Sequence, residues 1–228
     1  MTIDIKVLAT GSSGNAYLIK DGKSSLLLDC GISFSEIQKR SDYARIDTIF
    51  VSHSHGDHSK GVKEALRKGY TVYMPAEMAA KYENHNTFGI HGGMTIMTKD
   101  IKAVAFELVH DVQCLGYLID MEKARICYIT DTTYTKYTFP GVTHWMIECN
   151  HSRDILDEKV ASGELAQSLR NRIVQSHMNL ETVKGILAAN DLSKTEEIWL
   201  LHLSNSNSDE EHFKREIQAL TGKIVHVA

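Results

Sequence analysis

The sequence predicts an α/β fold in which helices cover layered sheets. Short apolar segments typical of strands dominate the first half of the chain, and segments of helical periodicity alternate with strands in the second half. Hydrophobic residues make up 43% and charged residues 24% of the 228 residues, which is the composition of an ordinary globular protein. A chain of this length can bury a sizeable core.

The first half is predicted to consist mainly of strands. They span residues 3–9, 16–20, 24–29, 47–51, 71–74, 94–97, 101–109, 115–120 and 124–129. Between them, residues 58–69 and 76–84 have helical spacing.

The second half is predicted to alternate strands with helices. The strands span 144–148, 197–203 and 223–227, and the helices span 153–162, 163–174, 180–191 and 209–220. The segment 197–203, EIWLLHL, is apolar enough for a buried strand. No long linker or low-complexity tract interrupts this pattern, so we expect a single domain over residues 1–228.

Charge and cysteine usage narrow the class of protein. The formal net charge is −4, so any contact with nucleic acid must be local. The four cysteines, Cys30, Cys114, Cys127 and Cys149, form no CxxC motif and are expected to be free thiols. The sequence has no signal-peptide pattern and no run of about 18 apolar residues, which predicts a cytoplasmic location and no membrane contact.

A histidine-rich stretch, VSHSHGDHSKG, is the strongest functional signal. His53, His55, Asp57 and His58 follow the predicted strand 47–51 and precede a predicted helix, so they lie on a loop where side chains can converge. Neutral imidazole and carboxylate groups suit Zn, Mn or Fe. The alternative is a polar loop with several exposed histidines.

The HxHxDH pattern after a hydrophobic strand resembles the signature of the metallo-β-lactamase fold. That resemblance implies an αββα four-layer sandwich with a metal site at one edge, between the sheets. It also implies further ligands at the ends of later strands, and AVAFELVHD, ARICYITDTTY and EIWLLHLSNSNS supply His110, Asp131 and His202. The early SLLLDCG supplies Asp29, which is expected to hold the histidine loop in place.

The resemblance further implies two divalent metal ions, Zn or Mn. One would be bound by His53, His55 and His110, the other by Asp57, His58 and His202, with Asp131 bridging them. A hydroxide shared by the two metals would attack phosphorus, and Asp57 would hold or shuttle its proton.

Several branches of this family fit the sequence less well. Asp131 occupies a position where a zinc β-lactamase typically has cysteine, and His55 one where di-iron redox members have Glu. Only about 70 residues separate Asp131 from His202, so the inserted domain of the β-CASP nucleases is absent, as is a Gly/Pro-rich arm like that of tRNase Z.

The segment 8–19, LATGSSGNAYLI, resembles the opening of the YycJ/WalJ group of nuclease-like metallo-hydrolases. Gly11 and Gly14 permit a tight turn, and Ser12, Ser13 and Asn15 add small donors that could contact phosphate oxygens. The alternative is a plain hairpin turn, in which these residue types are common.

Two later segments resemble the same group. The strand-ending MIECNHSRDIL includes Asn150, a candidate substrate contact, and LRNRIVQSHMNLETVKGIL includes His177, Arg170 and Arg172. His177 would donate to the phosphate or to the leaving oxygen, and the arginines would meet the nucleic-acid backbone.

The second of these segments departs from the group at two positions. Met178 and Asn179 stand where the group tends to have Leu and Ser. The alternative for Asn179 is a helix start with Thr182, which would be structural.

These features together predict a phosphodiesterase, with a YycJ/WalJ-like exonuclease on DNA as the leading case. A phosphodiesterase for cyclic or short nucleotides also fits, since it needs no extended basic groove. A thioesterase- or lactonase-type hydrolase, with an apolar pocket near the metals, is a weaker alternative. A metal-binding protein without activity is disfavoured by the complete set of predicted ligands.

Overall fold

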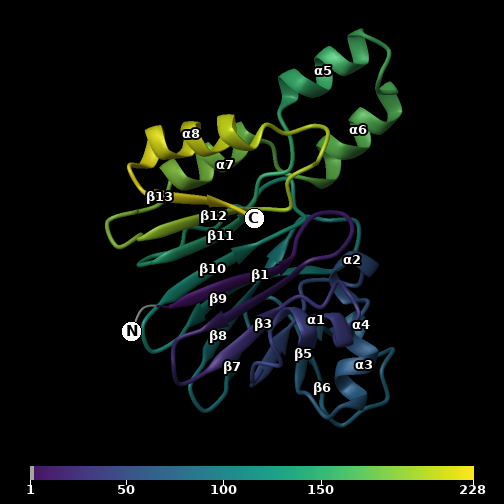
Figure 1. Ribbon diagram of the computed structural model, residues 1–228, viewed down its shortest axis with the longest axis vertical. Helices are drawn as coiled ribbons and strands as arrows, with labels where there is room; N and C mark the ends of the chain where they lie inside the picture. The colour runs from purple at the N-terminus through teal and green to yellow at the C-terminus, as the bar shows by residue number, and fades with distance from the viewer. Residues whose placement is uncertain (1–2) are drawn as a thin grey trace. The chain divides into compact units, whose positions relative to one another are not determined.

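The computed structural model describes residues 3–228 and contains two sheets with helices (Figure 1). The first sheet has six strands in the order β1-β2-β3-β4-β5-β6, and the second has seven in the order β13-β12-β11-β10-β9-β8-β7. This arrangement confirms the predicted α/β class. The chain divides into two compact units, Met1–Glu107 with Val112–Arg125, and Leu108–Asp111 with Ile126–Ala228.

The first unit contains the six-stranded sheet. Its strands are β1 (Asp4–Ala9), β2 (Ala16–Lys20), β3 (Ser25–Leu28), β4 (Thr48–Phe50), β5 (Val72–Pro75) and β6 (Thr87–Ile90). The pairs β1–β2 and β2–β3 are antiparallel, and the neighbours from β3 to β6 are parallel. The same unit includes β7 (Thr95–Met97), β8 (Lys102–Leu108, except its last residue) and β9 (Cys114–Asp120).

Four short helices gather on one side of this six-stranded sheet (Figure 1). They are α1 (Phe34–Arg40), α2 (Gly56–Ser59), α3 (Val62–Arg67) and α4 (Ala76–Ala79). Their apolar side chains, including Phe34, Ile37 and Val62, form one core cluster with Leu27 and Ile49 of the sheet. Burying such side chains contributes roughly 1.5–3 kcal/mol each, so this cluster fixes the strands whose ends carry the histidine loop.

The second unit is built on four parallel neighbours in the order β13-β12-β11-β10. They are β10 (Arg125–Ile129), β11 (His144–Glu148), β12 (Glu197–Leu201) and β13 (Ile224–Val227). The helices are α5 (Arg153–Ala161), α6 (Gln167–Ser176), α7 (Leu180–Ala188) and α8 (Glu210–Thr221). All five residues of β11 are buried, as expected for a central parallel strand. The carboxyl ends of these strands meet at one edge, where ligands bind in such sheets.

Most predicted elements are present, but two elements were not predicted, one predicted helix is shorter and another is divided. The helix α1 and the strand β6 were not predicted, and the predicted helix at 76–84 ends at Ala79. The predicted helix at 58–69 is two helices, α2 and α3, separated at Gly61. The segment after β3 packs closely against this break, because a Cβ atom on Gly61 would lie 2.5 Å from the Ile32 carbonyl oxygen.

Two further expectations concern cysteines and membranes. All four cysteines are buried and none of them forms a disulfide, which confirms the prediction of thiols. Within residues 3–228, no helix is long and apolar enough to cross a bilayer.

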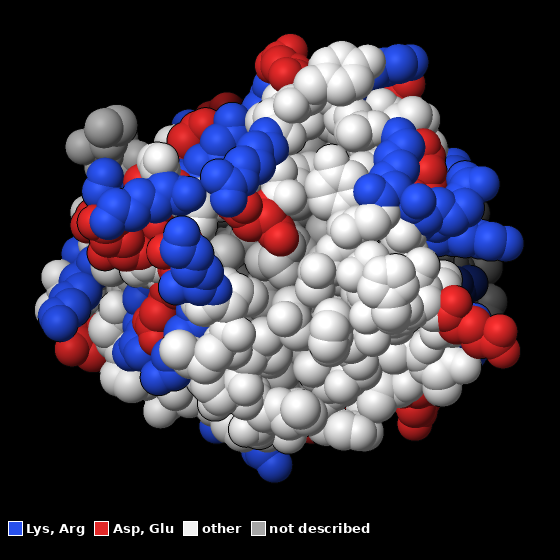
Figure 2. All heavy atoms as spheres, turned by 90° about the horizontal axis from the view of Figure 1, so that it is seen from below, with Lys and Arg blue, Asp and Glu red and all other residues white. Residues whose placement is uncertain are grey.

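Charged side chains of both signs are interspersed on the face shown in Figure 2, around a broad area that carries none. That face therefore presents mixed charge rather than a continuous basic surface, in agreement with the net charge of −4.

Candidate metal centre

The histidine loop of the first unit follows β4 and brings three imidazole rings together. The ring centroids of His53 and His55 are 4.8 Å apart, and those of His53 and His58 are 4.3 Å apart. The rings of His53 and His58 are buried, while His55 and Asp57 keep partial exposure. Three imidazole rings this close can offer ring nitrogens to a common metal site.

Asp29 holds this loop from the end of β3. Its Oδ2 lies 2.6 Å from His58 Nδ1, and its Oδ1 accepts a 2.7 Å hydrogen bond from the Ser52 backbone N–H. With Nδ1 bonded to a carboxylate, the nitrogen of His58 left for a metal is Nε2, which lies 3.0 Å from Asn15 Nδ2 in this structure. These contacts support the role predicted for Asp29.

The glycine turn that precedes β2 packs against the same loop. Gly11 and Gly14 both have positive φ, at 89° and 148°, and Gly14 N donates to Gly11 O to close the turn. Asn15 is buried, and its Oδ1 accepts hydrogen bonds from Gly11 N and from Tyr17 Oη, each 3.0 Å long. Its backbone N–H donates to the Asp57 carbonyl oxygen at 2.7 Å.

These bonds commit Asn15 to the turn and the histidine loop. They favour a structural role for its amide over the predicted substrate contact. Ser12 and Ser13 are exposed on the same turn, so their predicted contact with phosphate stays a prediction.

The three candidate ligands of the second unit each follow the end of a strand. His110 comes two residues after β8, Asp131 two residues after β10, and His202 directly after β12. Asp131 Oδ1 lies 2.7 Å from His202 Nδ1, and Asp131 Oδ2 lies 4.0 Å from His110 Nε2. Asp131 thus stands between two imidazoles, one at each carboxylate oxygen.

Three residues of the candidate site have an uncommon backbone conformation. Asp29, Asp131 and His202 have φ values of 58°, 43° and 54°, in the left-handed region, which Asp42 and Tyr43 also adopt in a turn away from the site. Strained φ/ψ of this kind clusters at functional sites. Asn150, at a predicted substrate position, is buried and donates through Nδ2 to the His202 carbonyl oxygen at 2.8 Å, which holds that strained backbone.

Glu148, at the end of β11, is a site residue that sequence reasoning missed. It is completely buried, and its Oε1 lies 2.6 Å from His177 Nδ1 and 3.3 Å from His202 Nδ1. Its Oε2 accepts hydrogen bonds from the backbone N–H groups of Thr132 and Met178. Asp131, Glu148, His177 and His202 each offer one ligand atom, and these atoms all lie within 4.8 Å of one another. A carboxylate at the end of the buried strand HWMIE was the available signal.

The buried carboxylates and imidazoles of this cluster stabilise each other's charged forms. Burial alone would raise the pKa of Glu148, but the His177 charge, with hydrogen bonds from His177 and His202, holds it below its usual value. Burial would lower the pKa of His202, but the Asp131 carboxylate beside it raises that pKa to about 10. The pKa of His177 is likewise lowered by burial but raised overall by Glu148.

The remaining predicted residues lie near α6. His177 follows α6 directly and keeps 21% of its side chain exposed, which leaves it accessible to a substrate. Arg170 pairs with Asp157 of α5 at 2.7 Å, so its charge is already compensated, whereas Arg172 is exposed. Asn179 caps α7 by accepting from Thr182 N, which confirms the structural alternative for that residue.

Comparison with known protein families shows which family this chain belongs to. The family model described as beta-lactamase superfamily domain matches residues 25–203, well over half of the chain. The chain belongs to this superfamily. The match includes Asp29, all four residues of the histidine loop, and His110, Asp131 and His202.

Relatives within the superfamily share most of their length with this chain. It is 29% identical to exodeoxyribonuclease WalJ of Streptococcus pneumoniae, over 90% of this chain and 83% of that protein. It is 26% identical to exodeoxyribonuclease YycJ of Bacillus anthracis, over 92% and 86% of the two chains.

Solved structures show the same fold. The metallo-beta-lactamase fold protein YhfI from Bacillus subtilis matches with a TM-score of 0.76 at 19% identity, over 99% of this chain and 95% of that one. A diphosphatase from the PhnP family matches with a TM-score of 0.70 at 16% identity, over 100% and 94%. The predicted metallo-β-lactamase fold is thereby confirmed.

Proposed function

We propose that this protein is a metal-dependent phosphodiesterase of the exonuclease type that acts on DNA. The observation that carries the proposal is the similarity, over nine tenths of the chain, to proteins named exodeoxyribonucleases. The buried imidazoles and carboxylates at successive strand ends supply chemistry suited to that reaction. The proposal includes DNA as the partner and a cytoplasmic location.

We assign two Zn or Mn ions to the ligands expected from the sequence. His53, His55 and His110 would hold one ion, Asp57, His58 and His202 the other, and Asp131 would serve both. The donor set fits such ions, because it consists of imidazole nitrogens and carboxylate oxygens. Asp29 and Glu148 lie beside the rings of His58 and His202, and Asn150 holds the His202 backbone. When bound, the metals supply an activated water and neutralise charge on the phosphoryl oxygens.

The side chains of this protein then manage protons and position. Asp57 accepts the proton of the attacking water, and the oxygen of that water forms a bond to phosphorus. The bond from phosphorus to the leaving oxygen breaks, and His177, oriented by Glu148 at 2.6 Å, donates to that oxygen or to the phosphate. The products are a phosphate monoester and a free hydroxyl.

A phosphodiesterase for cyclic or short nucleotides is the second candidate. It is favoured by the net charge of −4 and by the mixed charge on the face of Figure 2, since a short substrate needs no extended basic groove.

The decisive experiment is a cleavage assay on end-labelled single- and double-stranded DNA, supplemented with Mn²⁺ or Zn²⁺. We expect progressive shortening by the wild-type protein and none by Asp131→Ala. The exposed Asp100 provides a matched control, because Asp100→Ala also removes a carboxylate and should cleave normally. Cleavage of cyclic nucleotides alone would favour the second candidate, and full activity of Asp131→Ala would refute the metal assignment.

A further inference from the structure

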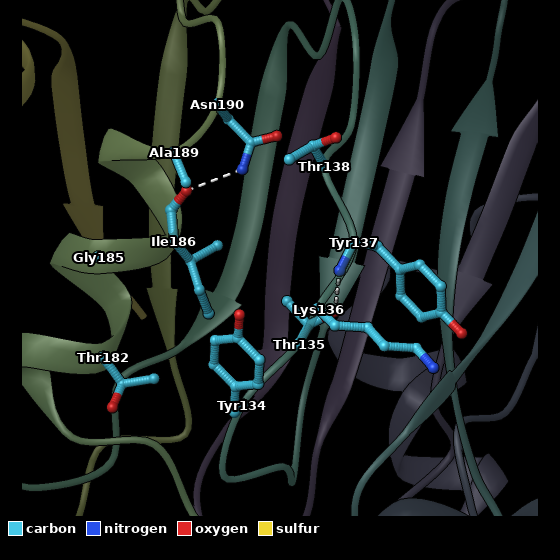
Figure 3. Close-up of a pocket in the computed structure, with 10 residues that line it drawn as sticks. All are labelled: Tyr134, Thr135, Lys136, Tyr137, Thr138, Thr182, Gly185, Ile186, Ala189 and Asn190. Atoms are coloured by element: carbon cyan, nitrogen blue, oxygen red, sulfur yellow. Dashed lines mark hydrogen bonds between the residues drawn. The ribbon is translucent and has the colours of Figure 1, made fainter.

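A small pocket lies between the loop that follows Asp131 and the helix α7 (Figure 3). Its volume is about 270 Å³, and its lining includes Tyr134, Lys136, Tyr137, Thr182, Ile186 and Asn190. The aromatic and basic residues come from the loop, whereas the aliphatic wall comes from α7 (Figure 3).

The loop that forms this pocket is fastened at both ends. Thr132 Oγ1 accepts a hydrogen bond from Val109 N and donates one to the Tyr134 carbonyl oxygen, each 3.0 Å long. Farther along, Phe139 N donates to Asn190 Oδ1 at 2.6 Å, which ties the loop to the end of α7. A ligand would thus meet a loop whose backbone is already held, which lowers the entropic cost of binding.

The chemistry of the lining suits a nucleobase. Tyr134 leaves 56% of its surface exposed, unusual for a large aromatic side chain, and it borders the pocket. Lys136 Nζ lies 5.5 Å from the centroid of the Tyr137 ring, and both side chains extend from the loop on the side away from α7 (Figure 3), so a cation lies beside the pocket. Aromatic faces stack on bases, and cations beside them meet the phosphates, which is the combination that binds single-stranded nucleic acid.

The pocket also lies close to the proposed centre along the chain. Tyr134 is three residues after Asp131, so the two Cα atoms are at most roughly 11 Å apart, from the span of a fully extended chain. A base seated on Tyr134 would therefore belong to a nucleotide next to the one whose phosphate meets Asp131.

We propose that this pocket binds an unpaired nucleobase of the DNA substrate, stacked on Tyr134 and adjacent to the scissile phosphate. The inference rests on the proposed function and deepens it, because it assigns a single-stranded end as the substrate form. Stacking tolerates any base, so the pocket would impose little sequence preference.

The test replaces bases one at a time by abasic sites in a short single-stranded DNA. For the wild-type protein, kcat/KM is measured with Mn²⁺ and Kd is measured in EDTA, where cleavage is blocked. One abasic position next to the cleaved bond should reduce kcat/KM or weaken Kd by about 5- to 150-fold, the range reported for losing one base–aromatic stack.

Variants of Tyr134, each assayed on intact and on abasic DNA, test whether this side chain contacts the base. Tyr134→Ala should show a similar loss on intact DNA and no additional loss at the abasic position, whereas Tyr134→Phe should keep the wild-type values. Tyr43, an exposed tyrosine of the other unit, gives the matched control, and Tyr43→Ala should bind normally.

The outcomes separate the two proposals. If the wild-type protein cleaves DNA but no abasic position changes kcat/KM or Kd, the pocket assignment is wrong and the proposed function stands. If the wild-type protein neither cleaves nor binds DNA, both are wrong. Should Tyr134→Ala fail to fold, the abasic scan on the wild-type protein decides alone.

Discussion

Glu148 Oε1 lies 2.6 Å from His177 Nδ1, and the Glu148 carboxylate is completely buried. The two residues are 29 positions apart and belong to β11 and to the segment after α6. A carboxylate that accepts from one ring nitrogen fixes the orientation of the ring and directs the other nitrogen outward. In the proposed mechanism, this contact would prepare His177 to donate a proton from Nε2.

We expect Glu148→Gln to lower kcat by about 10- to 100-fold, the usual effect of losing an outer partner of a functional histidine. The amide keeps the size of the side chain but cannot hold a protonated imidazole, so KM should change less than kcat. Steady-state kinetics on a short DNA would measure both, and metal analysis would show whether the ions are retained. An unchanged kcat with normal metal content would exclude the positioning role.

Asp29→Asn should weaken metal binding by about 10- to 100-fold. The substitution removes the charge that holds His58 Nδ1 at 2.6 Å, while asparagine tolerates the positive φ at this position. Competition with a chelator would measure the affinity. The buried Asp21 provides a control, because it caps a turn through Ser24 N and Asp21→Asn should leave metal affinity intact even if stability falls. Equal affinities for the wild-type protein and Asp29→Asn would contradict this role.

Gly31→Ala should be severely destabilising. A Cβ atom at Gly31 would lie 1.8 Å from the Asp57 carbonyl oxygen and 2.4 Å from Asn15 N, both of which are backbone atoms. Overpacking typically costs about 1–3 kcal/mol, and we expect a loss at or above the upper end. Gly185→Ala in α7 is the matched comparison, since nothing lies within 4 Å of its Cβ and alanine should stabilise the helix by about 0.5–1 kcal/mol. Urea denaturation of both variants would show the opposite signs, and a stable Gly31→Ala protein would contradict the close approach.

His151 should make the protein less stable in mild acid. Burial lowers its pKa from 6.5 to about 4, although Glu148 opposes the shift, while His177, Arg153 and Arg170 add to it. Neither ring nitrogen has a hydrogen-bond partner within the described residues. Below pH 6.5 the unfolded chain takes up a proton that the folded protein refuses until about pH 4, so stability falls as the pH falls through this window.

Between pH 7 and pH 5 this group should remove about 2 kcal/mol of unfolding free energy. Denaturation curves for the wild-type protein and His151→Gln would measure the difference, which should be smaller in the variant. His85 is exposed, so His85→Gln should retain the wild-type pH dependence. Identical pH dependence in all three proteins would show that His151 does not titrate in this way.

The strands could be predicted because apolar runs bounded by polar turns determine them locally. The same holds for the histidine loop, whose four residues are contiguous. Helix α1 was missed although Ser33 caps it through Glu36 N, a signal present in the sequence. Its short amphipathic pattern, with only Phe34 and Ile37 buried, gave a weak periodicity.

Contacts between distant segments could not be predicted in the same way. The role of Glu148 depends on His177, and the burial of Asn15 depends on Asp57, 42 positions away. Charge pairing such as that of Arg170 with Asp157 depends on how α5 and α6 pack together. Residue type alone therefore could not show that Asn15, Asn150 and Arg170, which stay predicted substrate contacts, also bond to other parts of the chain.

The left-handed backbone conformation of Asp29, Asp131 and His202 lowers the stability of the fold at residues that the proposed activity requires. Each such residue costs about 1–3 kcal/mol that glycine would largely recover, and the three positions are those assigned to the metal centre. Glycine there would also remove the carboxylate or imidazole that the proposed centre needs, and it would leave buried partners such as Ser52 N and His202 Nδ1 without their hydrogen bonds. A thermostabilised form that remains active would have to gain its stability elsewhere in the chain.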